Sequence, residues 1–464
     1  MNETAMGLKH PTVIDLQAPE TQARRVARHT AAPHQLLRST LLQSTDGRLM
    51  QAVFPAPCLL DLQALQRADT EWRAMPPTLR GHLLKPQQLE SMPALPGTVP
   101  DVTLRVDEQC LTLDTVFVES GHAEYLLKFT RDEYQALLHE HSVEIDHFAI
   151  PLTQTRPNLD APQQDEQEIR QAVDTITRRR VRARLAEEIE IAPLPISTQQ
   201  LMALRDREDV STHELANVIE SDPSLASQVI SWANSPYYGA PGTVRSIHDA
   251  VIRVLGFDLT MNLALGLALS RQLQLPKDGV HGYQHFWRDA VKRALMVDAF
   301  ARIMPPLSRP ISGLAYIAGL LHNFGYLILA EVFPPYFSLY CRYQEANPHV
   351  PPMYLERFLF GITREQIASH LFQTWGLPEA MCTAVRHQHN PRYHGDHFKY
   401  ANLLYLAHQY QHPYREQQLK RVPAAIYERL ELDPELALTA WQRLEEVETE
   451  QVSELVRLLE HGHG

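Results

Sequence analysis

The stretch ISGLAYIAGLLHNFGYLILA, residues 311–330, is the longest apolar run in the chain and carries His322 and Asn323 at its centre. Its length alone would permit a membrane-spanning helix. Polar groups at mid-membrane are costly, and prolines flank the run on both sides. We therefore expect a buried helix of a helical bundle and no membrane partner. Inside such a bundle the His-Asn pair is expected to be hydrogen-bonded, because buried polar groups must find partners.

Helix start signals lie on both sides of this run. Pairs with the spacing of a capping box are Ser197–Gln200, Ser211–Glu214 and Ser246–Asp249, and an N-cap aspartate precedes a proline at Asp222–Pro223 and Asp433–Pro434. These signals, together with apolar residues at helical spacing, predict helices. No strand pattern follows residue 190. The sequence predicts an all-α bundle over residues 169–410 and a short helical tail over 411–464.

The first part of the chain has a different texture. Short β-type runs, RLMQAVFPAPCLL at 48–60, VTLRVDE at 102–108 and TVFVES at 115–120, alternate with a helical stretch, RDEYQALLHEH at 131–141. This alternation predicts an α/β domain over residues 1–150. The Pro-rich, polar segment 151–168 then predicts an exposed linker. The expected fold class is a multi-domain α+β protein, an α/β domain followed by an all-α bundle.

Composition excludes several classes of protein. The 464 residues suggest two or three domains, and 43 Lys and Arg against 55 Asp and Glu give a net charge of −12. A general basic field for nucleic acid is absent, so no DNA partner is expected. The four cysteines form no C-x-x-C pair, which excludes a zinc ribbon or a disulfide framework. Free thiols without a secretory leader pattern indicate the cytoplasm.

The segment RHQHNPRYHGDHF at 386–398 carries four histidines, His387, His389, His394 and His397. Histidine clusters can bind metal. The i, i+2 spacing of His387 and His389 does not place both rings on one helical face. We therefore favour a solvated helix end over a metal site.

The helical part resembles the HDOD domain of bacterial signalling proteins. The resemblance runs in order from about residue 190 to 410, and its motifs are LPISTQQLMAL at 194–204, the segment STHEL to MNLAL at 211–265, HFWRDAVKRALM at 285–296, GLLHNFGYLIL at 319–329 and HLFQTWGLPEAMCTAVRHQHNP at 370–391. HDOD domains are similar in fold to the HD phosphohydrolases but typically lack their full ligand set. The resemblance implies a regulatory scaffold that binds signalling proteins or a small ligand rather than an enzyme.

The active HD relatives use an early histidine, a His-Asp pair and a late aspartate to bind two metals. By resemblance these positions fall on Asp289, His322, Asn323 and His408 in this chain. A carboxylate can bridge two metals and offset their charge, whereas a neutral asparagine does neither. We expect no cofactor. A single divalent metal on these four residues stays open, because histidine and carboxylate suit zinc, iron or manganese. A phosphohydrolase with a rearranged site is accordingly an alternative.

The segment SWANSPYYG at 231–239 carries the strongest HDOD signature. Trp232 is expected in the core. Tyr237 and Tyr238, next to a proline and a glycine, are candidates for a surface that faces a partner.

The first domain resembles the YbaK/ProX fold of aminoacyl-tRNA deacylases, over about residues 15–150. The similar stretches lie at 36–65, 89–108 and 116–138. By resemblance, the functional lysine corresponds to Arg38, and the glycine-rich substrate loop to ESMPALPG at 90–97, where Ser91 and Met92 replace small residues. The remaining candidate pocket residues are Gly97, Ser120 and Gly121. Arginine does not reproduce an ammonium geometry, so a tRNA partner is not favoured, although trans-editing of mischarged tRNA remains the second alternative.

Overall fold

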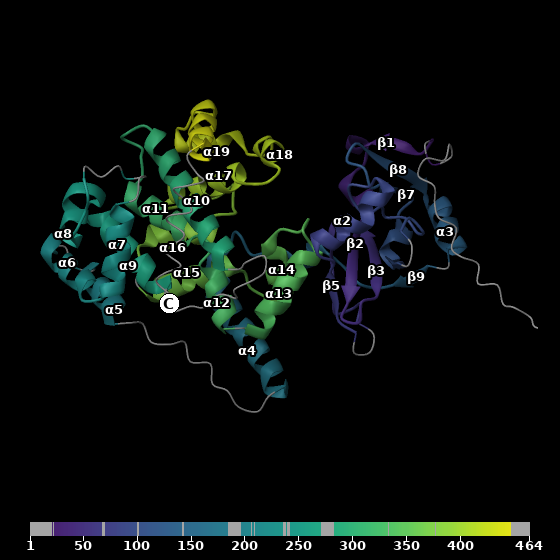
Figure 1. Ribbon diagram of the computed structural model, residues 1–464, viewed down its shortest axis with the longest axis horizontal. Helices are drawn as coiled ribbons and strands as arrows, with labels where there is room; N and C mark the ends of the chain where they lie inside the picture. Colours follow the sequence, from purple (N-terminus) through teal and green to yellow (C-terminus); the bar gives the residue numbers. More distant parts are fainter. Residues whose placement is uncertain are drawn as a thin grey trace, which may run out of the picture. The chain divides into compact units, whose positions relative to one another are not determined.

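The computed structural model divides into two compact units, one of residues 1–156 with 339–358, the other of residues 157–338 with 359–464 (Figure 1). The described residues are 21, 23–66, 70–99, 102–141, 143–183, 196–205, 207, 209–234, 238, 242–270, 283–332, 334–375 and 377–446. The boundary after residue 156 falls inside the expected linker. The return of residues 339–358 to the first unit was not expected from the sequence, where this segment is simply helical.

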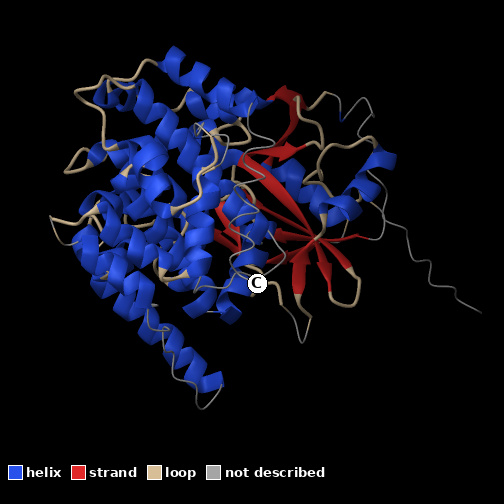
Figure 2. Ribbon diagram, turned by 60° about the vertical axis from the view of Figure 1, so that its left-hand side comes forward, coloured by secondary structure: helices blue, strands red, loops and turns tan. Residues whose placement is uncertain are grey.

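The first unit is built on a mixed sheet, drawn in red in Figure 2. Its strand order is β1 (Arg25–Ala27), β8 (Tyr125–Thr130), β7 (Thr115–Glu119), β2 (Leu36–Ser44), β3 (Leu49–Pro55), β6 (Val102–Asp107) and β9 (Glu144–Asp146), with β5 (Trp72–Ala74) also on β2 and a separate pair β4 (Cys58–Leu60) with β10 (Ala149–Pro151). β2 is antiparallel to β3 and parallel to β7. The helices are α2 (Pro77–Leu84) and α3 (Arg131–Glu140), with short 3-10 turns η1 (Arg28–Thr30), η2 (Pro33–Gln35), η3 (Lys85–Gln87), η4 (Glu108–Thr112), η5 (Leu152–Thr155) and, at the start of the second unit, η6 (Pro162–Gln164). The mixed α/β character expected for this region is confirmed.

The core of this sheet comes from the predicted β-type runs. Val53, Val106 and Val118 from three strands are fully buried, and Tyr134 and Leu138 of α3 pack into the same cluster. Burial of such branched side chains on a pleated surface is what favours a strand at these positions. The helix α3 covers the cluster because its apolar residues recur at i and i+4.

The segment 339–358 completes the β4 edge of the first unit. It holds the last turns of α13 (Pro334–Ala346) and most of α14 (Pro352–Phe360). The Asn347 side chain accepts a hydrogen bond from the Leu60 amide at 2.6 Å and donates one to the Leu60 carbonyl at 3.1 Å. The Tyr343 hydroxyl donates to Asp61 at 2.5 Å. The Asn347 side chain thereby satisfies both the amide and the carbonyl of Leu60, which a neighbouring strand would otherwise pair.

The second unit is largely helical and its described residues include no strand, which confirms the expected helical region. Its helices are α4 (Asp165–Ala183), α5 (Ile196–Arg205), α6 (Thr212–Glu220), α7 (Pro223–Ala233), α8 (Ile247–Ala250), the π-helical turn η8 (Val251–Leu255), α9 (Phe257–Ser270), α10 (Tyr283–Ile303), α11 (Ser312–Leu321), α12 (Gly325–Val332), the start of α13, α15 (Arg364–Thr374), α16 (Glu379–His387), α17 (Phe398–Tyr410), α18 (Arg415–Leu419), α19 (Ala424–Leu430) and a helix at 434–446.

The helix starts follow the local signals with one exception. Ser211 and Glu214 form the full capping box, and Asp222 accepts a hydrogen bond from the Leu225 amide. Ser246 is also an N-cap, at α8. The prediction for Ser197 is wrong, because this residue lies inside α5, where its buried hydroxyl lies 3.3 Å from Asp222. The Ser197 hydroxyl therefore donates to a residue before α7 instead of accepting a hydrogen bond at the start of its own helix.

Most of the segment 151–168 is exposed or half-buried, but polar groups between residues 158 and 165 bind the helical bundle, which the composition did not predict. Asp165, at the start of α4, is buried and forms a salt bridge with Arg386. The backbone carbonyl of Asn158 accepts a hydrogen bond from the same guanidinium at 2.8 Å. Asp160 accepts one from Asn390 at 2.9 Å. Ionic partners far along the chain therefore fix this proline-rich segment to the bundle.

The apolar run that opened the sequence analysis forms α11 and α12. The stretch Gly313–Glu331 is long and apolar enough to cross a membrane, but 94% of its most apolar window is buried inside the structure. Such burial is what we expected of a core helix.

Candidate functional site

The His-Asn pair lies at the junction of α11 and α12. His322 is the C-cap residue of α11, and α12 begins at Gly325. The backbone of α11 lies directly on α10, because a Cβ placed on Gly319 would lie 2.5 Å from the Ala294 Cα. Only glycine allows this approach. The close approach at Gly319 lies one turn before His322, which faces Asp289 of α10.

His322 and Asp289 form the centre of the site. The Nδ1 atom of His322 lies 2.7 Å from the Gly319 carbonyl, and Nε2 lies 3.4 Å from Asp289 Oδ2. The ring is buried, while 53% of the Asp289 side chain is exposed. A neutral ring carries a single N–H, so it donates either from Nδ1 to the Gly319 carbonyl or from Nε2 to the Asp289 carboxylate.

The electrostatic surroundings keep His322 neutral and Asp289 ionised. Burial lowers the pKa of His322, and the charge of Arg293 lowers it further, against the opposing effect of Asp289. For Asp289, its crowded surroundings favour the neutral form, but the His322 hydrogen bond and the Arg293 charge hold its pKa below the usual range. The pair therefore carries one negative charge near pH 7.

Asn323 serves the backbone of the neighbouring helix. Its amide nitrogen donates a long hydrogen bond, 3.4 Å, to the Phe286 carbonyl of α10. Its Oδ1 atom is buried without a hydrogen-bond partner. An ionised aspartate at this position could not donate to the Phe286 carbonyl.

Two arginines occupy the same region. Arg293 is 4% exposed, donates from Nε to Gln411 at 2.6 Å, and has Nη2 4.0 Å from Asp289. Its Nη1 has no hydrogen-bond partner. Arg364 forms an ion pair with Glu365 at 2.9 Å.

Close packing at the start of α12 holds Arg364 in place. Its guanidinium lies over the Tyr326 ring, 4.6 Å from the ring centroid. A Cβ on Gly325 would lie 2.3 Å from the Arg364 carbonyl oxygen, so α12 and α15 meet at their backbones. Gly325, two residues after Asn323, therefore allows the close helix contact that holds Arg364 near the His-Asn pair.

His389 and His408 complete the cluster. His389 Nε2 lies 3.1 Å from Arg364 and 3.2 Å from Glu365, and its ring meets that of His408 edge-on at 5.0 Å. Burial lowers the pKa of both histidines, and nearby arginine charge lowers both further. Burial opposes ionisation of Glu365, but Arg364 and His389 hold its pKa below the usual range.

The cluster balances its charge with side chains alone. Asp289 and Glu365 are anionic, Arg293 and Arg364 are cationic, and the histidines are neutral, so the four charges cancel. Within the described part of the chain, no group of three or more His, Cys, Asp or Glu is placed to hold a metal ion. The residues present do not fit a two-metal centre, because guanidinium groups stand where a hydrolase needs metal charge.

Comparisons with known proteins agree with this architecture. The model of the HDOD domain matches residues 191–391. A protein of Marinobacter aquaeolei VT8, provisionally assigned to signal transduction, is 36% identical over 94% of this chain and 96% of its own, with a TM-score of 0.81. The chain belongs to the HDOD family.

More distant relatives support the fold. An HDOD domain protein of Geobacter sulfurreducens, of unknown function, aligns with a TM-score of 0.51 at 20% identity, over 63% of this chain and 98% of its own. An uncharacterised curated protein of Treponema pallidum (strain Nichols) is 25% identical over 209 residues, which are 45% of this chain but only 39% of that relative.

The structure brings three of the four candidate HD-site residues into one cluster. Asp289 and His322 are in contact, and both Asp289 and Arg293 influence the pKa of His408. Asn323 follows His322 between α11 and α12, and its side chain contacts the Phe286 carbonyl of α10 instead. Sequence reasoning missed the charged residues Arg293, Arg364 and Glu365, and it placed His389 on a solvated helix end. Of these, only Arg293 had a local signal, its i+4 spacing from Asp289.

The prediction of a solvated helix end is wrong for His387 and His389, whereas His394 and His397 are exposed as expected. His387 is buried and stacks on Tyr393 with the rings 3.8 Å apart and 8° from parallel. His389 lies in the cluster. The residues 157–165 and α15 pack over this turn, which no local pattern reveals.

Of the two tyrosines proposed for a partner surface, the structure describes Tyr238 but not Tyr237. Tyr238 is half-buried, and its hydroxyl accepts a hydrogen bond from Trp232 at 3.2 Å. Trp232 is fully buried, as expected. Tyr237 lies outside the described residues.

In the first unit, the candidate pocket residues have structural partners. Ser120 is fully buried and donates to the Tyr125 carbonyl at 2.7 Å. The Gly121 carbonyl accepts hydrogen bonds from the amides of Glu90 and Ser91, and Gly121 itself has a φ of +89°. Gly97 also has positive φ, +66°. This pairing closes the loop at 90–97 onto the sheet.

The closed loop is filled by apolar side chains, since Met92, Ala94 and Leu95 are buried. Burial, and to a smaller extent the charge of Arg38 on β2, lowers the pKa of His349 to about 4. His349 also lies 3.0 Å from the Cys58 carbonyl. The segment 339–358 thus brings a half-buried histidine close to Arg38.

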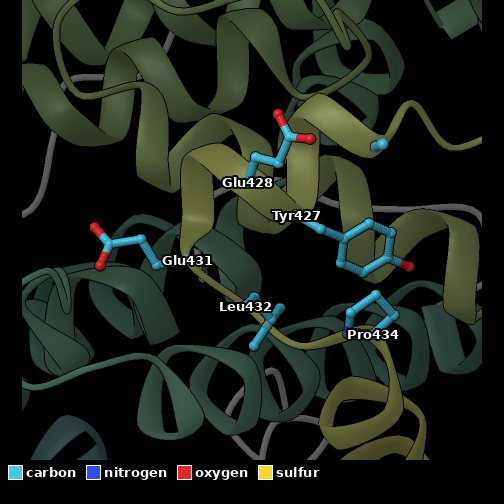
Figure 3. Close-up of a pocket in the computed structure, with 6 residues that line it drawn as sticks. Tyr427, Glu428, Glu431, Leu432 and Pro434 are labelled. Atoms are coloured by element: carbon cyan, nitrogen blue, oxygen red, sulfur yellow. The ribbon is translucent and has the colours of Figure 1, made fainter.

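A shallow hollow lies in the second unit, beside α19 (Figure 3). It encloses about 400 Å³ and is lined by Ala424, Tyr427, Glu428, Glu431, Leu432 and Pro434. The Tyr427 ring lies beside Pro434, and the two glutamates extend in different directions. No candidate site residue lines this hollow.

Proposed function

We propose that this HDOD protein is a regulatory component of signal transduction, which binds a protein partner or a small ligand and does not hydrolyse phosphoesters. The observation that carries the proposal is the balanced cluster at Asp289, His322 and Arg293. The likeness to the signal transduction protein of Marinobacter aquaeolei supports the regulatory role.

Hydrolysis of a phosphoester requires a strong nucleophile and stabilisation of the charge on the transferred phosphoryl group. HD hydrolases use metals for both purposes. Here the carboxylate of Asp289 is already in contact with His322 and near Arg293, and Asn323 donates to a backbone carbonyl. No described group is left to bridge a pair of metals. A helical bundle without such a bridging group supports binding rather than turnover.

Turnover assays test this conclusion. Purified intact protein is incubated with bis-(p-nitrophenyl) phosphate and with cyclic dinucleotides, in the presence of Mg²⁺, Mn²⁺ or Zn²⁺. We expect no product above the level of a His322→Ala variant. Product formation that the His322→Ala variant loses would overturn the proposal and restore the phosphohydrolase.

The binding half of the proposal is tested at the HDOD signature. Partners are identified by crosslinking in cells with the wild type, with Tyr237→Ala, and with Tyr238→Phe as a matched control. We expect a partner that Tyr237→Ala loses and Tyr238→Phe keeps. Identical recovery from all three proteins would remove this surface from the proposal.

For the first unit we propose a deacylase-like fold without the reaction. Arg38 in place of lysine, and a substrate loop packed with Met92, Ala94 and Leu95, support this view. Intact protein incubated with several mischarged tRNAs should release no amino acid. Release that is lost in Arg38→Ala would instead support trans-editing.

A further inference from the structure

The HDOD cluster is the group of charged and histidine side chains around His322: Asp289, Arg293, Arg364, Glu365, His389 and His408. We propose that the buried guanidinium of Arg293 takes the electrostatic place of a divalent metal in this cluster. Its charge then excludes cations that the other residues could bind. Cation exclusion of this kind holds whether or not the unit also binds a partner.

Half of a metal site is present in the cluster. His322 directs Nε2 at the Asp289 carboxylate, and its Nδ1 contacts a backbone carbonyl. This is the usual arrangement of a metal-binding histidine, whose second nitrogen is held by a carbonyl that fixes the tautomer. Histidine and carboxylate together suit zinc, cobalt and manganese. The half-exposed carboxylate leaves a path for an ion from solvent.

Arg293 is fixed beside this half site. Its Nη2 lies 4.0 Å from Asp289 Oδ1, and the hydrogen bond from Nε to Gln411 prevents the side chain from swinging away. A divalent ion on Asp289 would lie within several ångströms of this buried positive charge. Repulsion at such distances is strong where water is excluded.

The remaining contacts of Arg293 leave its charge in place. Nη1 has no hydrogen-bond partner, so no second carboxylate neutralises the guanidinium. Arg364 adds a second positive charge close enough to lower the pKa of Arg293, an effect smaller than that of burial. Glu365 balances Arg364. Asp289 is therefore the single carboxylate that balances Arg293 within the described cluster, and a metal would have to compete for it.

Removal of the Arg293 charge should open the site. Zn²⁺ and Co²⁺ are titrated by calorimetry into untagged, intact protein, and Co²⁺ binding is also followed by its visible absorption. We compare wild type, Arg293→Gln and Arg293→Lys, which keeps the charge. A second neutral variant, Arg293→Met, retains the aliphatic packing if Arg293→Gln does not fold. Because the chain has 23 histidines, only binding that disappears when His322→Ala is added is assigned to the cluster.

We expect no cluster binding in the wild type or Arg293→Lys, and one ion per chain in the neutral variant, with affinity on the order of a hundredfold tighter. Stoichiometric, His322-dependent binding by the wild type would overturn the inference. Equal, weak binding by the wild type and by a folded neutral variant would also overturn it. Turnover by the wild type would contradict the proposed function instead, so the two failures are distinguishable.

Discussion

At the scale of single residues, Asn323 decides how far the HD motif has changed. Its amide donates to the Phe286 carbonyl, so Asn323→Asp would place a buried carboxylate oxygen against a carbonyl oxygen. We expect this restoration of the His-Asp pair to destabilise the protein by about 1–3 kcal/mol. Urea unfolding with and without Mn²⁺ measures the change, and Asp289→Asn at the half-exposed position is the comparison. A variant as stable as the wild type without metal would contradict this view of Asn323.

The buried histidines predict sensitivity to acid. Burial, then the Arg386 charge, lowers the pKa of His387 to about 4, from about 6.5 in an unfolded chain. Between these two values the unfolded chain binds one more proton than the folded chain. Stability is therefore complete above pH 6.5 and falls as pH drops toward 4, by on the order of 1–2 kcal/mol for this residue after allowance for solvent screening.

This prediction is checked by unfolding free energies measured from pH 7 to pH 4. His387→Phe keeps the stack on Tyr393 but cannot take up a proton, so its profile should be flatter than that of the wild type. Parallel profiles for the two proteins would show that His387 does not contribute.

The same residues show what the sequence could predict of the site. Asp289, His322 and His408 were found because a family motif marks their positions. Arg364, Glu365 and His389 were not found, because their roles depend on contacts between helices that are distant in the chain. The bond between Arg293 and Gln411 joins residues 118 positions apart, which no local pattern can show.

At the scale of elements, two glycines allow the helices to meet at the site. Gly319→Ala would push a Cβ to 2.5 Å from Ala294 Cα, and we expect a loss of about 1–3 kcal/mol or more from overpacking. Gly266→Ala is the matched control, because its Cβ would meet only ordinary contacts at 3.7 Å or beyond. Alanine there should stabilise α9 by about 0.5–1 kcal/mol. Thermal unfolding of both variants checks the pair, and equal effects would contradict the close packing of α11 on α10.

Local sequence signals predicted where helices begin, but not which distant residues their polar side chains contact. Ser211 and Asp222 begin helices as expected, since an N-cap needs only the next three residues. Ser197 and the segment 157–165 differ from expectation. Their polar groups bind Asp222 and Arg386, which lie 25 and more than 200 residues away along the chain.

At the scale of the whole molecule, the first unit depends on residues 339–358. Asn347 satisfies both backbone groups of Leu60, so Asn347→Ala should leave them unpaired and destabilise that unit by about 2–4 kcal/mol. Hydrogen exchange at β4 and β10 measures the loss. A fragment of residues 1–156 should likewise show faster exchange there than the intact chain. Unchanged exchange in both would mean that the first unit folds without the inserted segment.

The central claim is that the HDOD cluster is complete without a metal, and elemental analysis of untagged protein tests it most directly. The wild type and His322→Ala are purified side by side, without a polyhistidine tag, and analysed for zinc, iron and manganese. We predict far less than one ion per chain in both proteins, with the wild type fully folded. A near-stoichiometric ion in the wild type that His322→Ala lacks would contradict the claim and return the chain to the metal-dependent phosphohydrolases.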